Sequence, residues 1–535
     1  MTGRLRSFLA ERGWHPAYAA VYGFLLAVFL AALAQFHLPG KGFTYLITFG
    51  AEMEHTWISK VRNLSLHVQR GSVGYDAQYY AQIAMDPSLQ NRQLHSAVDS
   101  LGYRARRILL PAVAYVTGLG RPEWIIQAYA LQNAVAWIAL ALVLLHWFPP
   151  RDFDRLLRWA GVLFSFGLLV SFRNALVDGP SLLLVAVGAL LWERGRTKSA
   201  TVVLALGGLT KETNLLAAAA VLPAGKTTPR DLLMVAVRGL LILMPLALWM
   251  VYLIWRVPGS VYAGERNFDL PLAAYGRKWL EIAAGWPQLS VENPGPALSL
   301  LMMVSLTAQL VYLVCRPQWS QLWWRIGVSY AVLMVFLGDA VWEGYPGAAS
   351  RVLLPMQLAF NVLVPAGNGW KVLLVAGNLT MLGAVAALHR PEGEGYQVKG
   401  DGDLLVAENG RPFAVEFDEH WHGPERGQGT YWVWSSGAGA IELRNPHAFE
   451  LTARLRFQVT TAGTRNLMVR LNGAEVWRVS LAEAQAVQVS LTQIRLPAGT
   501  SRLEFLTDEP ARRIGADPRD LAICLHNLRF DLARP

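Results

Sequence analysis

A succession of apolar runs, separated by short basic loops, fills the chain from its start to about Leu388. Hydrophobic residues make up 53% of the 535 residues, and charged residues make up only 16%. A soluble globular protein rarely has this composition, whereas a multi-pass membrane protein does. The apolar runs therefore predict a multi-pass α-helical membrane protein over most of the length.

Basic residues set the orientation of the predicted spans. Arg4, Arg6 and Arg12 precede the first run, so the positive-inside rule places the N-terminus in the cytoplasm. Threading the chain from there gives about eleven spans, keeps the basic loops inside and leaves the C-terminus outside. The run at residues 108–118 is too short to span and is interpreted as a re-entrant or surface helix.

The sequence changes character after about residue 390. Residues 453–459 and 467–471 alternate apolar and polar side chains with the two-residue period of half-buried strands. Asn472-Gly473 between such stretches is a hairpin signal. This pattern predicts an antiparallel β-sandwich.

The predicted division is therefore a membrane domain over residues 1–390 and an extracytoplasmic β-sandwich over residues 391–535. The first extracytoplasmic loop of the membrane domain covers residues 37–107. This topology is that of a multi-pass membrane protein with an external C-terminal domain.

The net charge of +10 does not indicate nucleic-acid binding, because the basic residues lie in short loops and no nucleic-acid-binding motif accompanies them. Two cysteines, Cys315 and Cys524, do not make a disulfide framework. His420 and His422 have the spacing of a metal pair but no further ligands nearby, so no metal site is predicted there.

Acidic residues near the ends of apolar runs share the non-cytoplasmic side of this topology. Charged groups at membrane depth are costly and usually functional. Their convergence predicts an active site at the outer membrane surface. These residues are Asp76, Asp86, Asp178, Glu212, Asp339 and Glu343.

The loop before the second span holds the candidate general bases. Asp76 lies among Tyr75, Gln78 and Tyr79, which are candidate substrate-binding residues, and Asp86 follows ten residues later. A carboxylate within hydrogen-bond reach of an acceptor hydroxyl can take its proton. Asp76 and Asp86 are therefore the two candidate catalytic residues.

Four cations fall on the same side: Arg104, Arg107, Lys211 and Arg351. A phosphate leaving group needs cations, and the planar fork of arginine suits phosphate best. Lys211 and Glu212 also interrupt an apolar run, and a broken helix at membrane depth is tolerated beside a cavity. A base together with a phosphate clamp predicts transfer of a group from a lipid phosphate.

Simpler structural roles are open for the same residues. An isolated aspartate in a loop is often a turn or cap residue, and Asp178 before a Gly-Pro pair fits a helix cap. Lys211 and Glu212 fit a plain ion pair, and the arginines at 104–107 fit lipid headgroup binding.

Residues 74–80, 103–107 and 209–213 resemble segments of the GT-C class of membrane glycosyltransferases and of related bacterial membrane proteins. Members of the class use polyprenyl-phosphate-linked sugars and carry a catalytic acidic residue in the first large extracytoplasmic loop. The resemblance implies that Asp76 or Asp86 is the base. The chain lacks the side-by-side acidic pair of many members, and a divalent metal stays open as a cofactor.

Residues 431–437 and 440–446 are similar to jelly-roll modules appended to bacterial envelope glycosyltransferases. Such modules often bind carbohydrate, so the resemblance implies that Trp432 or Trp434 stacks on a sugar face. Packing of one of them in the core is the alternative.

The favoured hypothesis is an inverting transferase that moves a sugar from a polyprenyl phosphate to an extracytoplasmic glycan or lipid. The alternative is a transporter or flippase for a lipid-linked glycan, in which the same charges line a pathway. The position of the charges separates the two, because a transporter places them near the bilayer midplane on broken helices.

Overall fold

The computed structural model describes most of the chain. Arg4, Arg6 and the predicted domain boundary at 390–391 lie outside the described residues. The described residues are 10–38, 40–69, 72–225, 227–257, 265–289, 294–344, 348–388, 394–407, 411–427, 430–483, 485–515 and 517–534.

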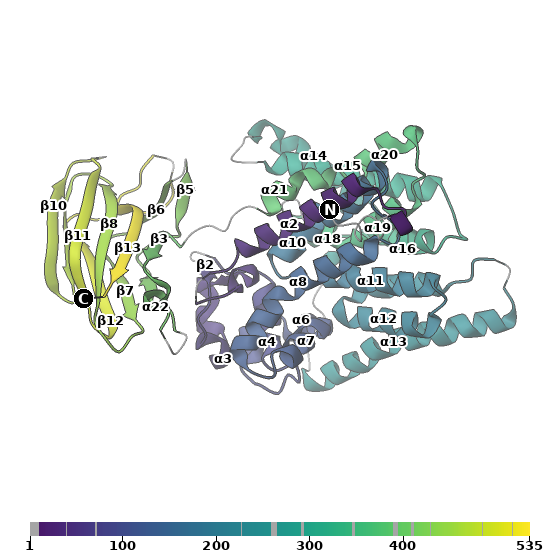
Figure 1. Ribbon diagram of the computed structural model, residues 1–535, viewed down its shortest axis with the longest axis horizontal. Helices are drawn as coiled ribbons and strands as arrows, with labels where there is room; N and C mark the ends of the chain where they lie inside the picture. Colours follow the sequence, from purple (N-terminus) through teal and green to yellow (C-terminus); the bar gives the residue numbers. More distant parts are fainter. Residues whose placement is uncertain are drawn as a thin grey trace. The chain divides into compact units, whose positions relative to one another are not determined.

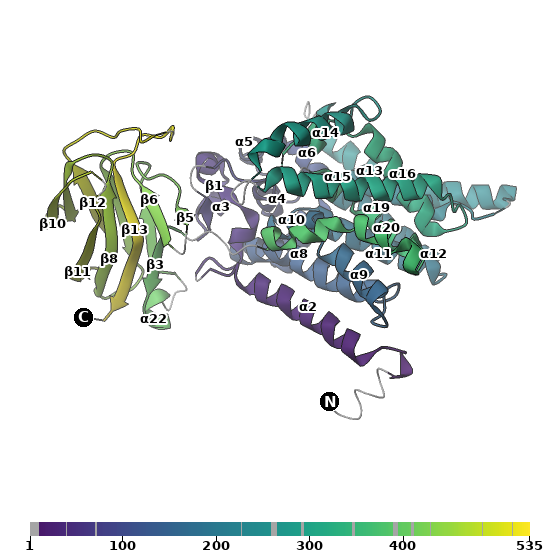
Figure 2. The same cartoon turned by 90° about the horizontal axis from the view of Figure 1, so that it is seen from above.

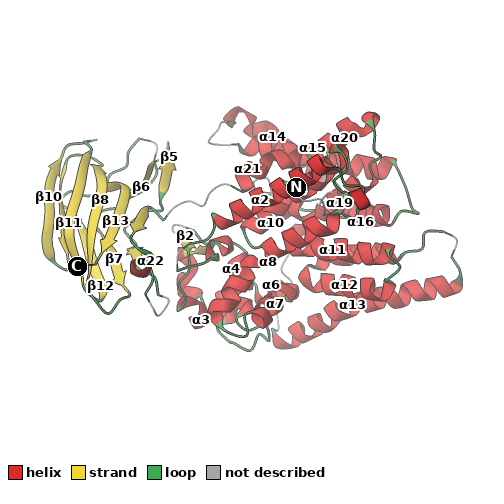
Figure 3. Cartoon of the chain, in the orientation of Figure 1, coloured by secondary structure: helices red, strands yellow, loops and turns green. Residues whose placement is uncertain are grey.

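The chain divides into two compact units, which we call the helical unit and the sandwich unit (Figures 1 and 3). The helical unit combines Met1–Ala34, Thr56–Leu64 and Tyr75–His389. The sandwich unit combines Gln35–His55 and Ser65–Gly74 with Arg390–Pro535. Two pieces of the predicted first loop therefore belong with the C-terminal part, which the sequence did not indicate.

Four helices of the helical unit are long and apolar enough to cross a membrane (Figure 2). They are α2 (Pro16–Ala34), α8 (Pro122–Leu144), α13 (Pro229–Arg256) and α15 (Gly295–Cys315). By length and composition, the described residues thus hold four candidate spans, or up to six if each of two bent helix pairs is one span. The chain has the helices of a membrane protein, and the number of eleven spans stays a prediction.

The bent pairs explain part of the difference. α9 (Phe153–Leu163) and α10 (Phe166–Arg173) are bent by 41° at Phe164 and Ser165. The segments Asn368–Ala376 and Leu379–Ala387 are bent by 48°. In sequence each pair reads as one apolar run, because hydropathy does not mark where a helix breaks.

Other predicted spans are shorter helices. The expected return span at 214–223 is a 3-10 helix, η4 (Glu212–Val221). Four further predicted spans correspond to α11 (Asp178–Glu193), α12 (Thr197–Thr210), α16 (Leu322–Phe336) and α19 (Leu354–Leu363).

Helix α8 shows how an interior helix is specified. Pro122 begins the helix without losing a hydrogen bond, and Glu123 complements the positive end of its dipole. Buried Tyr129, Asn133 and Trp137 recur at intervals of four residues, so they lie on one face. α8 thereby packs against α7 (Leu109–Thr117) and α11.

Helix α13 has the opposite character. Thr228 and Asp231 form a reciprocal capping box at its start. Only 11% of its most apolar 18-residue stretch is buried within the protein, and Leu248 and Trp255 are exposed. A row of exposed apolar side chains is costly in water and favourable in lipid, so α13 has the surface of a lipid-facing helix.

Short helices complete the helical unit. α4 (Ala77–Ala84) packs on α7 and α8. α7 has nine residues, so it is too short to cross a bilayer, as the length of its apolar run predicted. The remaining short helices named below are α3 (Ser59–Arg62), α5 (Leu94–Ala97), α6 (Leu101–Arg104), η3 (Ala105–Arg107), η5 (Glu265–Asn267), α14 (Ala273–Gly285), α17 (Asp339–Trp342) and α18 (Ala349–Val352).

The C-terminal part of the sandwich unit consists of two mostly antiparallel sheets (Figure 1). The first-loop pieces of the unit hold a separate two-stranded parallel sheet of β1 (Phe49–Gly50) and β2 (Val68–Gln69). The first sheet has the order β10-β9-β12-β7-β4 and the second has the order β11-β8-β13-β6-β5, with β3 parallel to β13. The strands are β3 (Tyr396–Lys399), β4 (Ala414–Phe417), β5 (Glu425–Gly427), β6 (Thr430–Trp434), β7 (Gly439–Asn445), β8 (Leu451–Thr461), β9 (Arg465–Leu471), β10 (Ala474–Leu481), β11 (Val487–Leu496), β12 (Gly499–Thr507) and β13 (Ile523–Ala533).

The alternating pattern of the sequence produces the sandwich core. Leu455, Phe457 and Val459 of β8 are buried, whereas the residues between them face outward. Asn472 and Gly473 join β9 to β10 with φ values of 50° and 84°, the left-handed conformation that a two-residue hairpin turn requires. The predicted strands and the predicted hairpin are therefore present.

A partly buried ion pair joins the first-loop pieces to the start of the C-terminal part within the sandwich unit. Lys41 Nζ lies 2.6 Å from Glu394 Oε1, and Tyr396 donates a hydrogen bond to the same carboxylate. His67 Nδ1 is 3.5 Å from Glu394. Burial opposes ionisation of Glu394, but the hydrogen bonds from His67 and Lys41 and the Lys41 charge hold its pKa well below the usual range.

Candidate functional site

Asp76 directly precedes α4, which is fixed by its buried side chains against α7 and α8. The Asp76 side chain makes no capping hydrogen bond to the helix. Its Oδ2 instead lies 2.9 Å from Arg104 Nη1, and 38% of the side chain is exposed. A capping role therefore does not account for Asp76, and the carboxylate is both anchored and accessible.

Arg104 lies at the end of α6 and is shared between two carboxylates. Asp99 accepts hydrogen bonds from Arg104 Nε at 3.0 Å and from Nη2 at 2.7 Å. The guanidinium also lies 5.2 Å from the Tyr79 ring and 5.7 Å from the Tyr103 ring. Burial and the neighbouring Asp99 charge raise the pKa of Tyr79, so this ring stays neutral.

Arg107 makes the second group of contacts, from the end of η3. It donates to Tyr80 Oη at 2.8 Å and to Tyr103 Oη at 3.1 Å. Its Nε lies 3.2 Å from Glu212 Oε2. The planar guanidinium therefore ties the first loop to the start of η4.

The third group surrounds Asp178, in the first turn of α11. Its side chain is only 6% exposed and is paired with Lys211 and, at 3.4 Å, with Arg351. Lys211 has an extended backbone between α12 and η4, which directs it toward Asp178. Arg351 also donates to Tyr75 Oη at 3.3 Å. Asp178 thus neutralises two cations, in addition to any effect on its own helix.

These three groups form one assembly, because Arg351 also interacts electrostatically with Asp76 and Arg107. Four ion-paired cations face four carboxylates, so the formal charges of the paired side chains balance, and Arg106, 5.4 Å from the Tyr103 ring, adds a further cation beside them. Buried charges require such compensation. We call this assembly the charge cluster; it comprises Asp76, Asp99, Arg104, Arg107, Asp178, Lys211, Glu212 and Arg351.

Most of the residues proposed from the sequence meet in this cluster or touch it. Tyr75 contacts Arg351 and Tyr79 contacts Arg104, while Gln78 is buried in α4 beside Tyr79. Sequence reasoning missed Asp99, Tyr80 and Tyr103. The short spacing of Asp99 and Arg104 was the available signal, but an Asp–Arg pair five residues apart is common in loops.

Asp86 does not join the charge cluster. It follows α4 at the end opposite Asp76 and accepts hydrogen bonds from Ser88 and from the Asn91 backbone N–H. Burial opposes ionisation of Asp86, yet these hydrogen bonds lower its pKa. Its geometry is that of a turn residue.

Asp339 and Glu343 also lie apart from the partners of Arg351. Asp339 pairs with Arg277 of α14 at 2.8 Å, and Glu343 pairs with Arg266. Asp339 and Glu343 precede Arg351 by only a few residues in the sequence, but they lie in and after α17, whereas Arg351 lies in α18. Their ion-pair partners are therefore different from those of Arg351. Both pairs are largely exposed.

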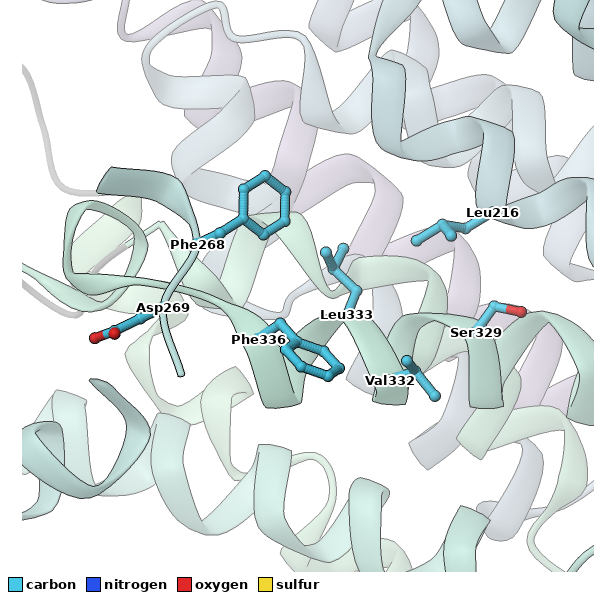
Figure 4. Close-up of a pocket in the computed structure, with 7 residues that line it drawn as sticks. All are labelled: Leu216, Phe268, Asp269, Ser329, Val332, Leu333 and Phe336. Atoms are coloured by element: carbon cyan, nitrogen blue, oxygen red, sulfur yellow. The ribbon is translucent and has the colours of Figure 1, made fainter. Parts of the chain in front are cut away.

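An apolar pocket of about 360 Å³ is lined by residues of η4 and α16 and by Phe268 and Asp269 (Figure 4). Leu216 of η4 lines it one turn beyond Glu212, and Phe268 follows Asn267, which donates to Tyr103 Oη at 3.3 Å. The Asp269 carboxylate points away from the apolar side chains. The other lining residues are Ser329, Val332, Leu333 and Phe336 of α16.

Trp432 and Trp434 lie on the outer face of the second sheet and are half-buried. Trp432 is paired in register with His526, whose ring centroid is 6.1 Å away, and His526 is paired with Gln458. Residues directly opposite in an antiparallel pair point to the same side. We call these residues, together with Thr460 beside His526, the aromatic face.

The outer face of the first sheet is different. Arg444 pairs with Glu416 at 2.8 Å, and Arg502 lies 3.4 Å from Glu504. These side chains are mostly exposed, as on an ordinary solvated surface. We call this surface the charged face. The second sheet also carries ion pairs beside the two tryptophans, because Glu425, the register partner of Trp432, pairs with Arg519, and Arg456 pairs with Asp531.

Within the part of the chain that the structure describes, no group of three or more His, Cys, Asp or Glu side chains is arranged to hold a metal ion. The acidic residues of the charge cluster are instead bound to arginine and lysine. These residues do not fit a metal centre, and we derive no step through one.

Comparison with known proteins gives weak likenesses. No family model and no curated protein matches the chain. Arabinosyltransferase EmbB from Mycobacterium smegmatis is similar over 95% of the chain and 64% of its own, with 11% identity and a TM-score of 0.38. The chain thus spans less than two thirds of that enzyme.

Carbohydrate-binding modules match a smaller part. A mutant of a family 29 module is 16% identical over 24% of the chain and 89% of its own, with a TM-score of 0.16. TmCBM61 in complex with β-1,4-galactotriose is 13% identical over 23% of the chain and 89% of its own, with a TM-score of 0.15. We base no functional conclusion on likenesses of this size.

Proposed function

We propose that the chain is an inverting glycosyltransferase that moves a sugar from a polyprenyl-phosphate donor to an extracytoplasmic glycan or lipid acceptor. The observation that carries this proposal is the charge cluster: an accessible carboxylate, Asp76, lies beside four cations in a largely buried setting. General-base catalysis needs the accessible carboxylate, and a departing phosphate needs the cations.

In the proposed reaction, Asp76 accepts the proton of the acceptor hydroxyl. The acceptor oxygen attacks the anomeric carbon, the bond from that carbon to the phosphate oxygen breaks, and polyprenyl phosphate leaves with the electron pair. A single displacement inverts the anomeric configuration. Arg104, Arg107, Lys211 and Arg351 stabilise the charge that develops on the phosphate.

The pocket beside the cluster supports a lipid donor. Phe268, Leu333 and Phe336 offer an apolar surface for the first isoprene units. The cluster follows from this surface through Asn267, which contacts Tyr103, and through Glu212 of η4, which pairs with Arg107. Burial of an isoprenoid chain contributes about 0.8 kcal/mol for each CH₂ removed from water. Phosphate and chain are thus both accommodated within the helical unit.

The transporter alternative is less well supported. Asp178 begins α11 and Lys211 follows α12, so these charges lie at helix ends. Asp76, Asp99 and Arg104 come from short helices and turns outside the long apolar helices. A transport pathway requires charges along the depth of the membrane, and these side chains gather at one end.

A transfer assay tests the proposal directly. The purified full chain is incubated with a panel of polyprenyl-phosphate sugars and candidate acceptors, and released polyprenyl phosphate is measured. We expect release that depends on acceptor and on Asp76, with inversion seen in the NMR coupling of the product. Release that persists in Asp76→Asn, or transbilayer movement of the lipid without release, would overturn the proposal.

We also propose that the first loop and the sandwich unit are extracytoplasmic. Single cysteines at Ser72 and Ser436, in a background with Cys315→Ser, should react with an impermeant reagent in intact cells. Cys524 is buried and serves as an internal negative control. Protection of either site until the cells are lysed would contradict this orientation.

The aromatic face supports a second binding function, recognition of an uncharged glycan by the sandwich unit. Trp432 offers an apolar ring surface, while Gln458 and His526 offer hydrogen-bond partners. Glu425, opposite Trp432 on β5, is neutralised by its pair with Arg519 at 2.9 Å. Sugars present an apolar ring face and hydroxyl groups, so they suit this combination. Trp434 lies two residues after Trp432 on β6, so it points to the same side and extends this surface.

A further inference from the structure

We propose that Asp99 is a positioning residue for Arg104, and that the donor phosphate displaces Asp76 from Arg104 and so releases the base. This inference rests on the proposed glycosyl transfer. It assigns a role to Asp99, which lies outside the conventional base-and-cation pair. It also sets an order of events, in which donor binding precedes deprotonation of the acceptor.

The two carboxylates use different edges of the Arg104 guanidinium. Asp99 occupies the edge formed by Nε and Nη2, through two hydrogen bonds of 3.0 and 2.7 Å. Asp76 is bound to Nη1 at 2.9 Å. A two-point contact of a carboxylate with arginine fixes the plane of the guanidinium, so Asp99 determines where Nη1 points.

Asp76 is the partner that an incoming phosphate can replace. Asp99 makes two hydrogen bonds to Arg104 and a third, of 2.7 Å, with the Ser100 backbone N–H. Asp76 is held to Arg104 through Nη1 alone. The Asp76 and Asp99 side chains are equally accessible, at 38% and 39% exposed, so the number of contacts decides between them. Because charge-assisted hydrogen bonds are the strong contacts here, loss of the Asp76 contact costs less than loss of the two-point contact.

The aromatic surroundings keep Arg104 in place during the exchange. Its guanidinium lies 5.2 Å from the Tyr79 ring, 5.8 Å from Tyr80 and 5.7 Å from Tyr103. Only 11% of the side chain is exposed. Arg104 is therefore not free to follow Asp76, and the mobile member of the trio is the carboxylate.

Displacement links donor binding to base activation. While Asp76 Oδ2 is ion-paired with Arg104 at 2.9 Å, that oxygen is less available to accept a proton from an acceptor hydroxyl. A phosphate oxygen that binds Nη1 replaces Asp76 as the negative charge that neutralises Arg104. The Asp76 carboxylate is then free to turn to the acceptor hydroxyl. Without donor, the enzyme consequently holds its base in an ion pair.

Binding of undecaprenyl phosphate to the purified full chain in nanodiscs, titrated by native mass spectrometry, tests both parts. Asp99→Asn keeps only one acceptor for Arg104, so we expect about tenfold weaker binding, partly restored in Asp99→Glu. Asp76→Asn removes the competing carboxylate, so we expect binding about two- to fivefold tighter than wild type. A merely structural role would not tighten binding.

The matched control is Asp152→Asn. Asp152 pairs with Arg155 and caps α9 away from the cluster, and asparagine caps equally well, so binding should equal wild type. Melting temperatures identify any variant that fails to fold. With active protein, Asp99→Asn should raise the KM for the donor by a similar factor and change kcat less.

The outcomes separate this inference from the proposed function. If wild type binds and Asp99→Asn binds equally well, or Asp76→Asn binds no more tightly, the inference is overturned while transfer stands. If wild type does not bind undecaprenyl phosphate at all, the lipid-phosphate donor itself is wrong. Transfer activity in wild type, measured in parallel, identifies which of the two has failed.

Discussion

The charge cluster of the helical unit and the aromatic face of the sandwich unit present polar groups in opposite ways. In the cluster each cation is paired with a carboxylate, and Asp178 is only 6% exposed. The aromatic face carries tryptophan, histidine and glutamine, and the acidic neighbour of Trp432, Glu425, is neutralised by Arg519. A buried balanced cluster suits a charged ligand that exchanges partners, whereas a neutral aromatic surface suits a neutral ligand.

The difference has an energetic origin. A charge brought into the helical unit must find compensation, since an unpaired buried charge costs several kcal/mol. The sandwich surface remains hydrated, and its binding energy comes from apolar contact with hydrogen bonds at the rim. Substitutions in the cluster should therefore have large effects on rate and stability, and those on the aromatic face should have modest effects on affinity.

The largest effect is expected at Asp76. Asp76→Asn keeps the size of the side chain but removes the proton acceptor, so transfer should fall by about 10²–10⁴-fold. Lipid-phosphate binding should become about two- to fivefold tighter, because the competing carboxylate is removed, and the melting temperature should be retained. The measurement is release of polyprenyl phosphate under saturating donor. Near-normal turnover would remove Asp76 from the mechanism and leave the cluster as a binding site only.

The next effect concerns stability. Asp178→Ala leaves Lys211 and Arg351 without their shared carboxylate, and breaking a buried pair in this way costs about 3–5 kcal/mol. Glu343→Gln is the matched control, because its pair with Arg266 has side chains 55% and 72% exposed. We expect it to cost about 1 kcal/mol or less.

Thermal unfolding of both variants in the same detergent gives the comparison. A large shift for Asp178→Ala beside a small one for Glu343→Gln supports a buried, balanced cluster. Equally small shifts in melting temperature for the two variants would mean that water compensates Lys211 and Arg351. The energetic contrast between the charge cluster and the aromatic face would then disappear.

A smaller effect is expected on the aromatic face. Trp432→Ala should weaken binding of uncharged oligosaccharides by about five- to tenfold, because one aromatic contact is worth roughly 1 kcal/mol beyond its area. Glu442→Gln on the charged face is the control and should bind like wild type. A glycan array probed with the full chain, followed by titration, provides the measurement. Equal binding by all three proteins would contradict a site at Trp432.

Much of the charge cluster could be predicted from the sequence, because orientation of the spans by the basic loops places Asp76, Asp178, Lys211 and Arg351 on one side. Apolar runs and the alternating pattern also predicted a helical part followed by a sandwich. These are signals that the chain carries locally, in composition and period.

The rest depends on contacts between distant residues. Nothing near Lys41 in the sequence indicates that it binds Glu394, so the place of the first-loop pieces in the sandwich unit stayed hidden. The break of the apolar run at Phe164 and the pairing of Glu343 with Arg266 are likewise set by packing. Local patterns fix which segments are apolar, and tertiary packing fixes where they bend and which charges meet.

The smallest effect is expected at Asp86, which sharpens the contrast with Asp76 at the other end of α4. Asp86→Asn should leave transfer within about twofold of wild type, as for a surface change outside the reacting groups.

The hydrogen bonds from Ser88 and Asn91 lower the pKa of Asp86 in the folded state below its value in the unfolded chain. The stability that ionised Asp86 contributes is therefore present above about pH 4 and is lost as the pH falls further. Melting temperatures of wild type and variant should consequently differ at pH 6 and converge toward pH 3. A variant that loses transfer as severely as Asp76→Asn would move the base to Asp86, whereas a constant difference in melting temperature would show that its charge plays no part.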